Sequence, residues 1–184
     1  MTIYSKPLPD GYSRNGIVYP MRTDFRVWAK YEGLVTDNDI APDMALSAAV
    51  KLIFPTAPPV DSRLREFIEW FYRCGEEPRE TRSRNFRSYS MEYDEGYIYA
   101  AFMQQYRIDL SEISLHWWKF SALFRGLRET KFTDIAGWRS ADIDKDTPKS
   151  RREFLYEMQE LYALPETLTD IERRERAADY YGRK

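Results

Sequence analysis

The sequence predicts a mainly α-helical protein, a multi-helix domain with a small β-hairpin at its N-terminus. Apolar residues recur at helical spacing along most of the chain, and Asn15-Gly16, a pair that favours a tight hairpin turn, precedes the run Ile17-Val18-Tyr19. The chain has 184 residues, of which 43% are hydrophobic and 32% are charged. This composition is typical of a globular protein, and the length suits one domain or one domain with a small appendage.

Three helices are expected between the hairpin and residue 75. Asp24 can cap the first, the second covers residues 42–54, and Asp61 or Ser62 can cap the third, which Gly75 ends at the C′ position. The apolar positions of these helices, in order, are Val27, Trp28, Tyr31, Leu34 and Val35; Ala45, Ala48, Ala49, Leu52 and Ile53; and Leu64, Phe67, Ile68, Phe71 and Tyr72.

The second half of the chain predicts a short strand followed by four helices. Tyr89, Met91 and Tyr93 alternate with polar residues, which indicates the strand. The expected helix starts, in order, are Asp94, then Asp109 or Ser111, then residue 133, and finally Thr147 as a cap before Pro148.

The pattern of charges divides the chain into four parts. Residues 1–75 hold the hairpin and three helices, and residues 76–88 form a charged linker with little apolar content. Residues 89–165 form a C-terminal helical part, and residues 166–184 a tail with five acidic and five basic side chains. The first and third parts are also compatible with one domain overall.

Charge and hydropathy argue against nucleic-acid and membrane partners. The chain has 28 Lys and Arg against 30 Asp and Glu, a net charge of −2, so a nucleic-acid partner is not favoured. The longest apolar run, over residues 97–103, is far shorter than the roughly 20 residues that span a bilayer. We therefore expect a soluble protein.

No set of catalytic or metal-binding residues is evident, so neither enzymatic activity nor a cofactor is expected. His116 and Cys74 are the only residues of their types, and both are interpreted as structural. Acidic residues at 142, 144, 146 and 153 match positions 1, 3, 5 and 12 of a calcium loop. Position 6, which needs glycine for its sharp turn, is Thr147, and three basic residues follow, so an acidic loop is the preferred interpretation.

Aromatic residues make up 16% of the chain, and some of them lie off the apolar helix positions. Trp70 shares a helix face with Arg73, and Trp118 shares one with Arg125. Such residues either reach a second layer of the core or form a surface for a partner protein, where Trp and Arg are enriched. The candidate partner-binding residues are therefore Trp70, Arg73, Trp118 and Arg125.

Several aromatic-rich strings, taken in their order along the chain, resemble one family. The strings are TDFRVW at 23–28, WFYRCG at 70–75, YSMEYD at 89–94, YIYAAF at 97–102, LHWWKF at 115–120 with ALFR at 122–125, WRS at 138–140 and LYALP at 161–165. Over about residues 16–165 they resemble the phage "gene product fifteen" family of siphophages and prophages of Gram-positive bacteria.

The resemblance implies a non-catalytic tail assembly chaperone. Such a protein would bind the tape measure protein and recruit tail tube subunits, and it could self-associate or act with an upstream chaperone form made by ribosomal frameshifting. It would work in the host bacterial cytoplasm and be absent from the finished virion. The family offers no catalytic residues to carry over.

Two other functions stay open at this point. One is a phage regulatory or nucleic-acid-binding adaptor that uses the arginines of the charged linker, Arg79, Arg82, Arg84 and Arg87. The other is a structural head–tail or tail-tube component, which would be found in purified virions.

Overall fold

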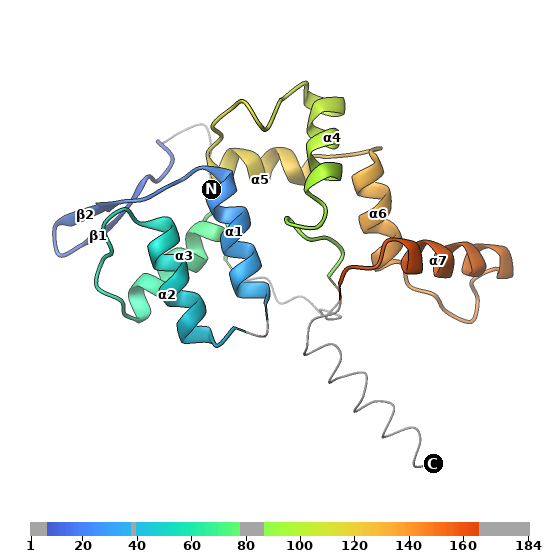
Figure 1. Ribbon diagram of the computed structural model, residues 1–184, viewed down its shortest axis with the longest axis horizontal. Coiled ribbons are helices and arrows are strands. Elements are labelled where there is room, and N and C mark those ends of the chain that lie inside the picture. The colour runs from blue at the N-terminus through green and yellow to red at the C-terminus, as the bar shows by residue number, and fades with distance from the viewer. Residues whose placement is uncertain (1–6, 38–39, 78–86, 166–184) are drawn as a thin grey trace, which may run out of the picture.

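The computed structural model describes residues 7–37, 40–77 and 87–165, and within these ranges it has one two-stranded sheet and seven helices (Figure 1). The predicted mainly α fold with an N-terminal hairpin is confirmed. The strands are β1 (Gly11–Arg14) and β2 (Ile17–Pro20). The helices are α1 (Phe25–Thr36), α2 (Pro42–Ile53), α3 (Ser62–Tyr72), α4 (Glu95–Tyr106), α5 (Trp117–Arg125), α6 (Lys131–Ser140) and α7 (Lys149–Leu161).

The hairpin has the two-residue turn that the sequence predicts. Asn15 and Gly16 have φ of 50° and 79°, and a turn with both central residues at positive φ matches the twist of the strands. Arg14 at the end of β1 forms an ion pair with Asp61 at 2.7 Å and donates a hydrogen bond to the carbonyl oxygen of Pro59. These contacts attach the hairpin to the loop that precedes α3.

Two predicted caps are confirmed, and one carboxylate has another role. Asp24 accepts a hydrogen bond from the backbone NH of Arg26, and Asp61 accepts one from that of Leu64, so both cap their helices. Asp94 stands at the N-cap position of α4, but its side chain does not cap the helix. It turns inward instead, because Arg139 lies buried beside it.

The predicted start of α5 at Asp109 or Ser111 is wrong. The helix begins at Trp117, after the N-cap residue His116. The Asp109 carboxylate accepts hydrogen bonds from the backbone NH and the hydroxyl of Ser111, at 2.9 and 2.6 Å. This local Asp turn holds the chain in a non-helical conformation.

Three smaller predictions after residue 88 also need correction. Residues 89–93 form no strand, because Ser90 accepts bonds from the backbone NH groups of Tyr93 and Asp94 and so closes a turn. Helix α6 begins at Lys131 rather than residue 133, since Thr130 caps it in a capping box. Helix α7 begins after Pro148, and the hydroxyl of Thr147 bonds to Asp144 instead of capping the helix.

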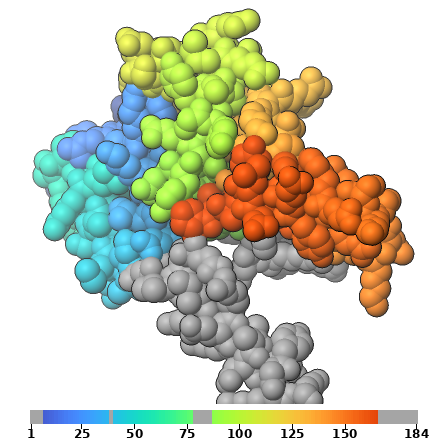
Figure 2. Space-filling model, turned by 45° about the vertical axis from the view of Figure 1, so that its right-hand side comes forward, coloured from blue at the N-terminus to red at the C-terminus, as the bar shows by residue number. Residues whose placement is uncertain are grey.

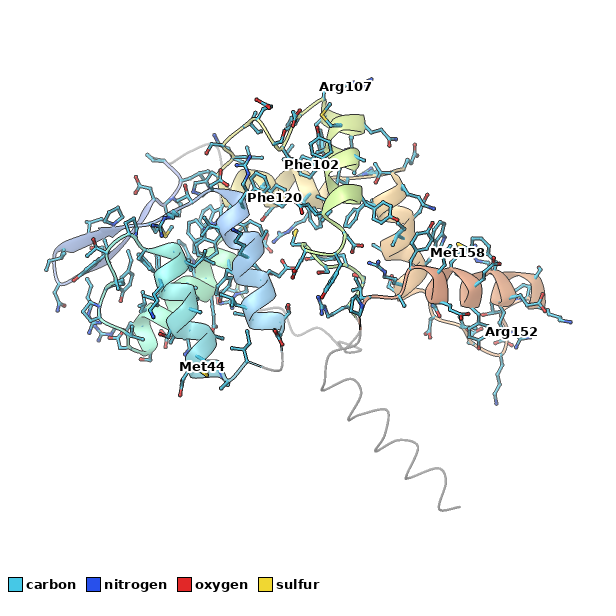
Figure 3. The ribbon with its side chains drawn as sticks, in the orientation of Figure 1. Met44, Phe102, Arg107, Phe120, Arg152 and Met158 are labelled. Carbon is cyan, nitrogen blue, oxygen red and sulfur yellow. The ribbon has the colours of Figure 1, made fainter. Side chains whose placement is uncertain are left out.

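The core is built largely from aromatic rings contributed by both halves of the chain. Phe120 of α5 stacks on Phe25 of α1, with ring centroids 4.6 Å apart, and on Phe102 of α4 at 5.1 Å (Figure 3). Trp28 of α1 and Phe71 of α3 are also fully buried, with centroids 4.4 Å apart. Segments on either side of residues 78–86 therefore share one hydrophobic core, while the predicted domain boundaries themselves stay predictions.

Helices α6 and α7 pack together on the far side of α4 from the N-terminal helices. In Figure 2, the green segment with α4 lies between the blue and cyan elements and the orange and red ones. Trp138 of α6 contacts Phe154 of α7, with ring centroids 5.8 Å apart, and Gln159 bonds to the carbonyl oxygen of Trp138.

Within the described ranges, no helix is both long and apolar enough to cross a bilayer. The linker arginines Arg79, Arg82 and Arg84, together with the predicted tail at 166–184, lie outside the described residues.

Candidate docking groove

The tryptophan-rich strings meet where α1, α3 and α5 come together. The backbone NH of Phe25 bonds to the carbonyl oxygen of Leu115 at 2.9 Å, and the NH of Trp117 bonds to that of Thr23 at 2.7 Å. This isolated bridge joins the N-terminal ends of α1 and α5. The strings at 23–28 and 115–120 therefore serve to hold two helix ends in register.

The same junction closes the C-terminal end of α3. Cys74, not Gly75 as predicted, occupies the C′ position with a left-handed φ of 57°, and its NH bonds to the carbonyl oxygen of Phe71. The indole NH of Trp118 donates to that same oxygen, and the indole NH of Trp117 donates to the carbonyl oxygen of Tyr72, both at 2.8 Å. Both tryptophans thus satisfy backbone groups that a helix end leaves open.

Three of the four predicted partner-binding residues lie at the surface beside this junction. Trp118 is the exception: it is only 4% exposed, so it belongs to the core, the other of the two environments considered for it. Trp70 is half-buried, and its ring centroid lies 5.4 Å from that of Trp118. Arg73 bonds to the carbonyl oxygen of Glu76, and Arg125 forms an ion pair with the Glu76 carboxylate at 2.7 Å.

The structure therefore gathers Arg73 and Arg125 at Glu76, while the Trp70 ring packs against Trp118. Partner binding by these three residues stays a prediction.

His116 acts as a structural residue. Its Nδ1 atom accepts a hydrogen bond from the backbone NH of Trp118 at 3.1 Å, and its Nε2 atom lies 3.0 Å from the carbonyl oxygen of Pro9. The tautomer with hydrogen on Nε2 satisfies both contacts. Burial lowers the pKa of His116, which favours this neutral form.

Cys74 is buried, and burial also raises the pKa of its thiol. A thiol that resists ionisation is a poor nucleophile, because the thiolate is the reactive form.

A groove that could hold a ligand lies between α1 and α4, with a volume of about 760 Å³. One wall is a single face of α1. The other wall comes from α4, and the buried rings of Phe25 and Phe120 lie at its base. The wall residues are Arg26, Ala29, Lys30, Gly33 and Leu34 on α1, Asp37 at its C-cap, and Glu95, Ile98 and Tyr99 on α4.

Gly33 is central to the shape of the groove. A Cβ atom added there would have no other atom within 4 Å, and the residue has an ordinary helical backbone. The missing side chain therefore leaves open space in the wall rather than permitting an unusual conformation.

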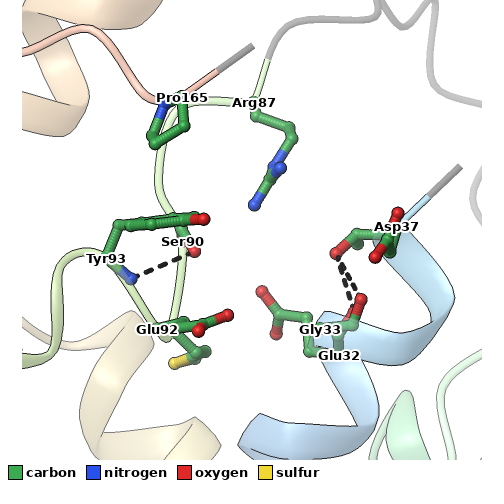
Figure 4. Close-up of a pocket in the computed structure, with 10 residues that line it drawn as sticks. Glu32, Gly33, Asp37, Arg87, Ser90, Glu92, Tyr93 and Pro165 are labelled. Carbon is green, nitrogen blue, oxygen red and sulfur yellow. Dashed lines mark hydrogen bonds between the residues drawn. The ribbon is translucent and has the colours of Figure 1, made fainter. Parts of the chain in front are cut away.

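A smaller pocket of about 180 Å³ continues the groove at the C-terminal end of α1. Gly33, Asp37, Met91 and Glu92 line both hollows, so the two adjoin each other. In Figure 4 the side chains of Glu32 and Arg87 project into this pocket from opposite sides. Three carboxylates, those of Glu32, Asp37 and Glu92, line it together with one guanidinium, that of Arg87.

Glu32 is the unusual member of this pocket, because it is a carboxylate only 8% exposed. The hydroxyl of Tyr72 donates a hydrogen bond to its Oε2 atom at 2.7 Å. Burial raises the pKa of Glu32, and the Tyr72 hydrogen bond and the positive charge of Arg87 offset this only in part. Burial of Tyr72, together with the negative charge of Glu32, raises the pKa of the Tyr72 hydroxyl.

The acidic residues at 142–153 do not converge in the structure. Asp144 accepts hydrogen bonds from Thr147 and from the backbone NH of Asp146, while Glu153 pairs with Lys149 at 3.7 Å. Among the described residues, no group of three or more acidic, histidine or cysteine side chains is arranged to hold a metal ion.

Sequence reasoning missed the groove. The α1 wall mixes charged and small residues, a pattern typical of a solvated helix face. Gly33 inside a predicted helix was the one available signal, because a helical glycine costs stability and often has a packing or binding reason.

A model of one protein family, described as "Bacteriophage Gp15 protein", matches residues 5–164 of the chain. No curated protein and no solved structure matches it.

Proposed function

The chain belongs to the Bacteriophage Gp15 protein family, and from this premise we propose that it is a tail assembly chaperone. It binds the tape measure protein and recruits tail tube subunits during tail assembly, and it catalyses no reaction. It acts in the host bacterial cytoplasm and leaves before the virion is complete. Contact with a second copy, or with an upstream chaperone form, is compatible with this role.

The groove between α1 and α4 is the observation that best supports this proposal. Grooves with an apolar base are a recurring way to hold the apolar face of an amphipathic helix. A long helical protein awaiting assembly exposes such faces, and covering them prevents aggregation. A non-enzymatic protein with a groove of this kind suits a holding function.

The local chemistry of His116 and Cys74 also favours a non-catalytic role. Both ring nitrogens of His116 have hydrogen-bond partners, and the Cys74 thiol is buried with a raised pKa. Neither side chain is prepared to act as a base or a nucleophile.

The nucleic-acid alternative has weaker support. Of the four linker arginines, Arg87 lies within the described residues, and it is half-buried and projects toward Glu32 rather than outward. A phosphate-binding arginine would need to face solvent.

The proposal is tested by co-expressing the full chain with the tape measure protein of the same genome. Co-elution on size exclusion, together with increased soluble tape measure protein, is the expected result. An unrelated phage protein of similar helical content serves as the control client. An insoluble tape measure protein, with the chain eluting alone both by itself and fused to the upstream frame, would refute the chaperone role.

A second measurement separates a chaperone from a structural component. Mass spectrometry of purified virions should not detect this chain. Detection at a stoichiometry similar to that of the tail tube protein would favour the structural head–tail alternative.

A further inference from the structure

We propose that the groove between α1 and α4 binds one amphipathic helix of a partner protein, and that a lysine or arginine of that helix enters the pocket around Glu32. The inference rests on the proposed function only for the source of the helix, the tape measure protein. The groove, the pocket and their charges are features of this chain.

The size of the groove suits about three helical turns. Its α1 wall runs from Arg26 to the C-cap residue Asp37, a span of eleven residue steps that rise about 16 Å along the helix axis. A helix of the same length presents apolar side chains at i, i+3 or i+4, and i+7 on one face. The open space at Gly33 lies in the second half of this wall, where a large apolar side chain can approach the α1 backbone.

The charges along the groove are unevenly distributed, and this selects a basic side chain at one end. The pocket that continues the groove has three carboxylates and one guanidinium. Lys30 lies near the middle of the α1 wall and repels a basic residue there. A partner lysine or arginine is therefore favoured at the pocket end of the groove, where Glu32 and Glu92 lie.

At the opposite end of the groove, no charged side chain of a partner is specifically favoured. Arg26 pairs with Asp24 at 3.2 Å and donates hydrogen bonds to the carbonyl oxygens of Leu110, Ser111 and Ile113. Its charge is already balanced by these contacts.

Burial of Glu32 provides an independent reason for a cation at the pocket end. A carboxylate that is 8% exposed has lost most of its hydration; its hydrogen-bond partner is the neutral hydroxyl of Tyr72, and the positive charge of Arg87 in the same pocket offsets the effect of burial only in part. A partner ammonium or guanidinium group would stabilise the ionised form. Binding of the basic helix should therefore be stronger at neutral pH than near pH 5.

The test uses the full chain and fluorescently labelled synthetic peptides that tile the tape measure protein of the same genome. Affinity is measured by fluorescence anisotropy. We expect the tightest peptides to combine the i, i+3 or i+4, i+7 apolar pattern with a lysine or arginine one turn beyond it. If no peptide binds, the inference is overturned, whether or not the full-length tape measure protein co-elutes with the chain.

Gly33→Gln tests the groove itself, with Gly137→Gln as its matched control. Gly137 lies on α6, away from the groove, and a Cβ atom there also meets nothing within 4 Å. Both changes improve helix propensity, so neither should unfold the protein. Gly33→Gln should weaken binding at least tenfold, and Gly137→Gln less than twofold. Equal effects of the two changes would refute the groove as the site while leaving the chaperone role intact.

Glu32→Gln tests the basic contact, because glutamine retains an acceptor for Tyr72 but has no charge. Replacing the peptide lysine or arginine with glutamine should weaken binding to the wild-type chain about tenfold. The same peptide change should lower the affinity for the double variant, which carries both Glu32→Gln and Glu92→Gln, by less than threefold. Equal losses in both backgrounds would overturn the assignment of the pocket.

Occupation of the groove by a second copy of the chain gives a different result. Sedimentation equilibrium would then show a dimer that Gly33→Gln dissociates, and this outcome would also overturn the inference.

Discussion

Replacing Arg139 with methionine should greatly destabilise the protein, because this arginine is the buried partner of Asp94. Its guanidinium contacts both carboxylate oxygens, with Nη1–Oδ2 and Nη2–Oδ1 distances of 2.6 and 3.0 Å. The side chains of Arg139 and Asp94 are 7% and 1% exposed. Arg139 also donates hydrogen bonds to the carbonyl oxygens of Ser88 and Tyr162. One side chain thus ties the start of α4 to the ends of α6 and α7.

The expected magnitude follows from burial rather than from the ion pair itself. Removing one partner of a buried pair leaves the other charge without compensation and costs about 3–5 kcal/mol. The carbonyl oxygens of Ser88 and Tyr162 lose a donor as well, which places Arg139→Met near the upper end of that range. Arg139→Lys retains the charge but not the two-pronged contact, and should cost about 2 kcal/mol.

The chain offers a matched control in the pair of Arg125 with Glu76. Its closest distance is 2.7 Å, nearly the same as in the buried pair, but its side chains are 53% and 39% exposed. Exposed pairs contribute about 0–1 kcal/mol, so Arg125→Met should have little effect on stability.

Urea unfolding followed by tryptophan fluorescence and by far-ultraviolet circular dichroism gives the free energy of unfolding for each variant. A double-mutant cycle of Arg139→Met with Asp94→Asn should show coupling of about 2 kcal/mol or more. Equal costs for Arg139→Met and Arg125→Met, or additive effects in the cycle, would refute the reasoning from burial.

Four further predictions concern single residues. Cys74 should react with a thiol reagent far more slowly in the native protein than in urea, because burial raises its pKa and covers it; rapid native labelling would contradict this. Burial lowers the pKa of His116 below its ordinary value of 6.5, so the unfolded chain binds more protons below about pH 6.5 and stability is lost as the pH falls. Urea midpoints at pH 5.5 and 7.5 should therefore differ more for the wild type than for His116→Asn, which retains a capping acceptor, and equal differences would exclude His116 as the cause. Gly33→Ala should stabilise the protein by about 1 kcal/mol, raising Tm by about 2–4 °C, because its Cβ enters open space in a helix. Gly11→Ala should lower Tm, because its Cβ would lie 2.9 Å from a backbone oxygen of β2, and a rise in Tm would show that the strands can separate to accept it.

Several residues of the aromatic-rich strings join helices to one another. Trp117 and Trp118 bond to the end of α3, while Arg139, from the string at 138–140, bonds to Asp94. Their order along the chain was enough to suggest the family, which the family match confirms over residues 5–164. They did not indicate the groove, although residues such as Arg26, Ile98 and Tyr99 line it, because a string in one helix does not show which other helix lies opposite.

The local sequence was enough to determine the hairpin turn, the caps of α1 and α3, and the apolar faces of most helices. Each depends on neighbours within a few residues: Asn15-Gly16 supplies the positive φ angles, and Asp24 and Asp61 reach the NH groups of the turn that follows them. The start of α5 could not be found in this way. Its cap, His116, is held by a bridge to residue 24, far away in the sequence.

The tertiary structure alone decided which tryptophans are buried and where a ligand could bind. Trp118 lies off the apolar positions of its own helix, but a second helix end covers it and accepts its indole hydrogen bond. The groove exists because α1 and α4, separated by residues 37–94, lie side by side with Gly33 between them. The periodicity of apolar residues indicates which face of a single helix is apolar. The space between two helices depends on how their side chains pack against each other, and a local sequence pattern does not predict this.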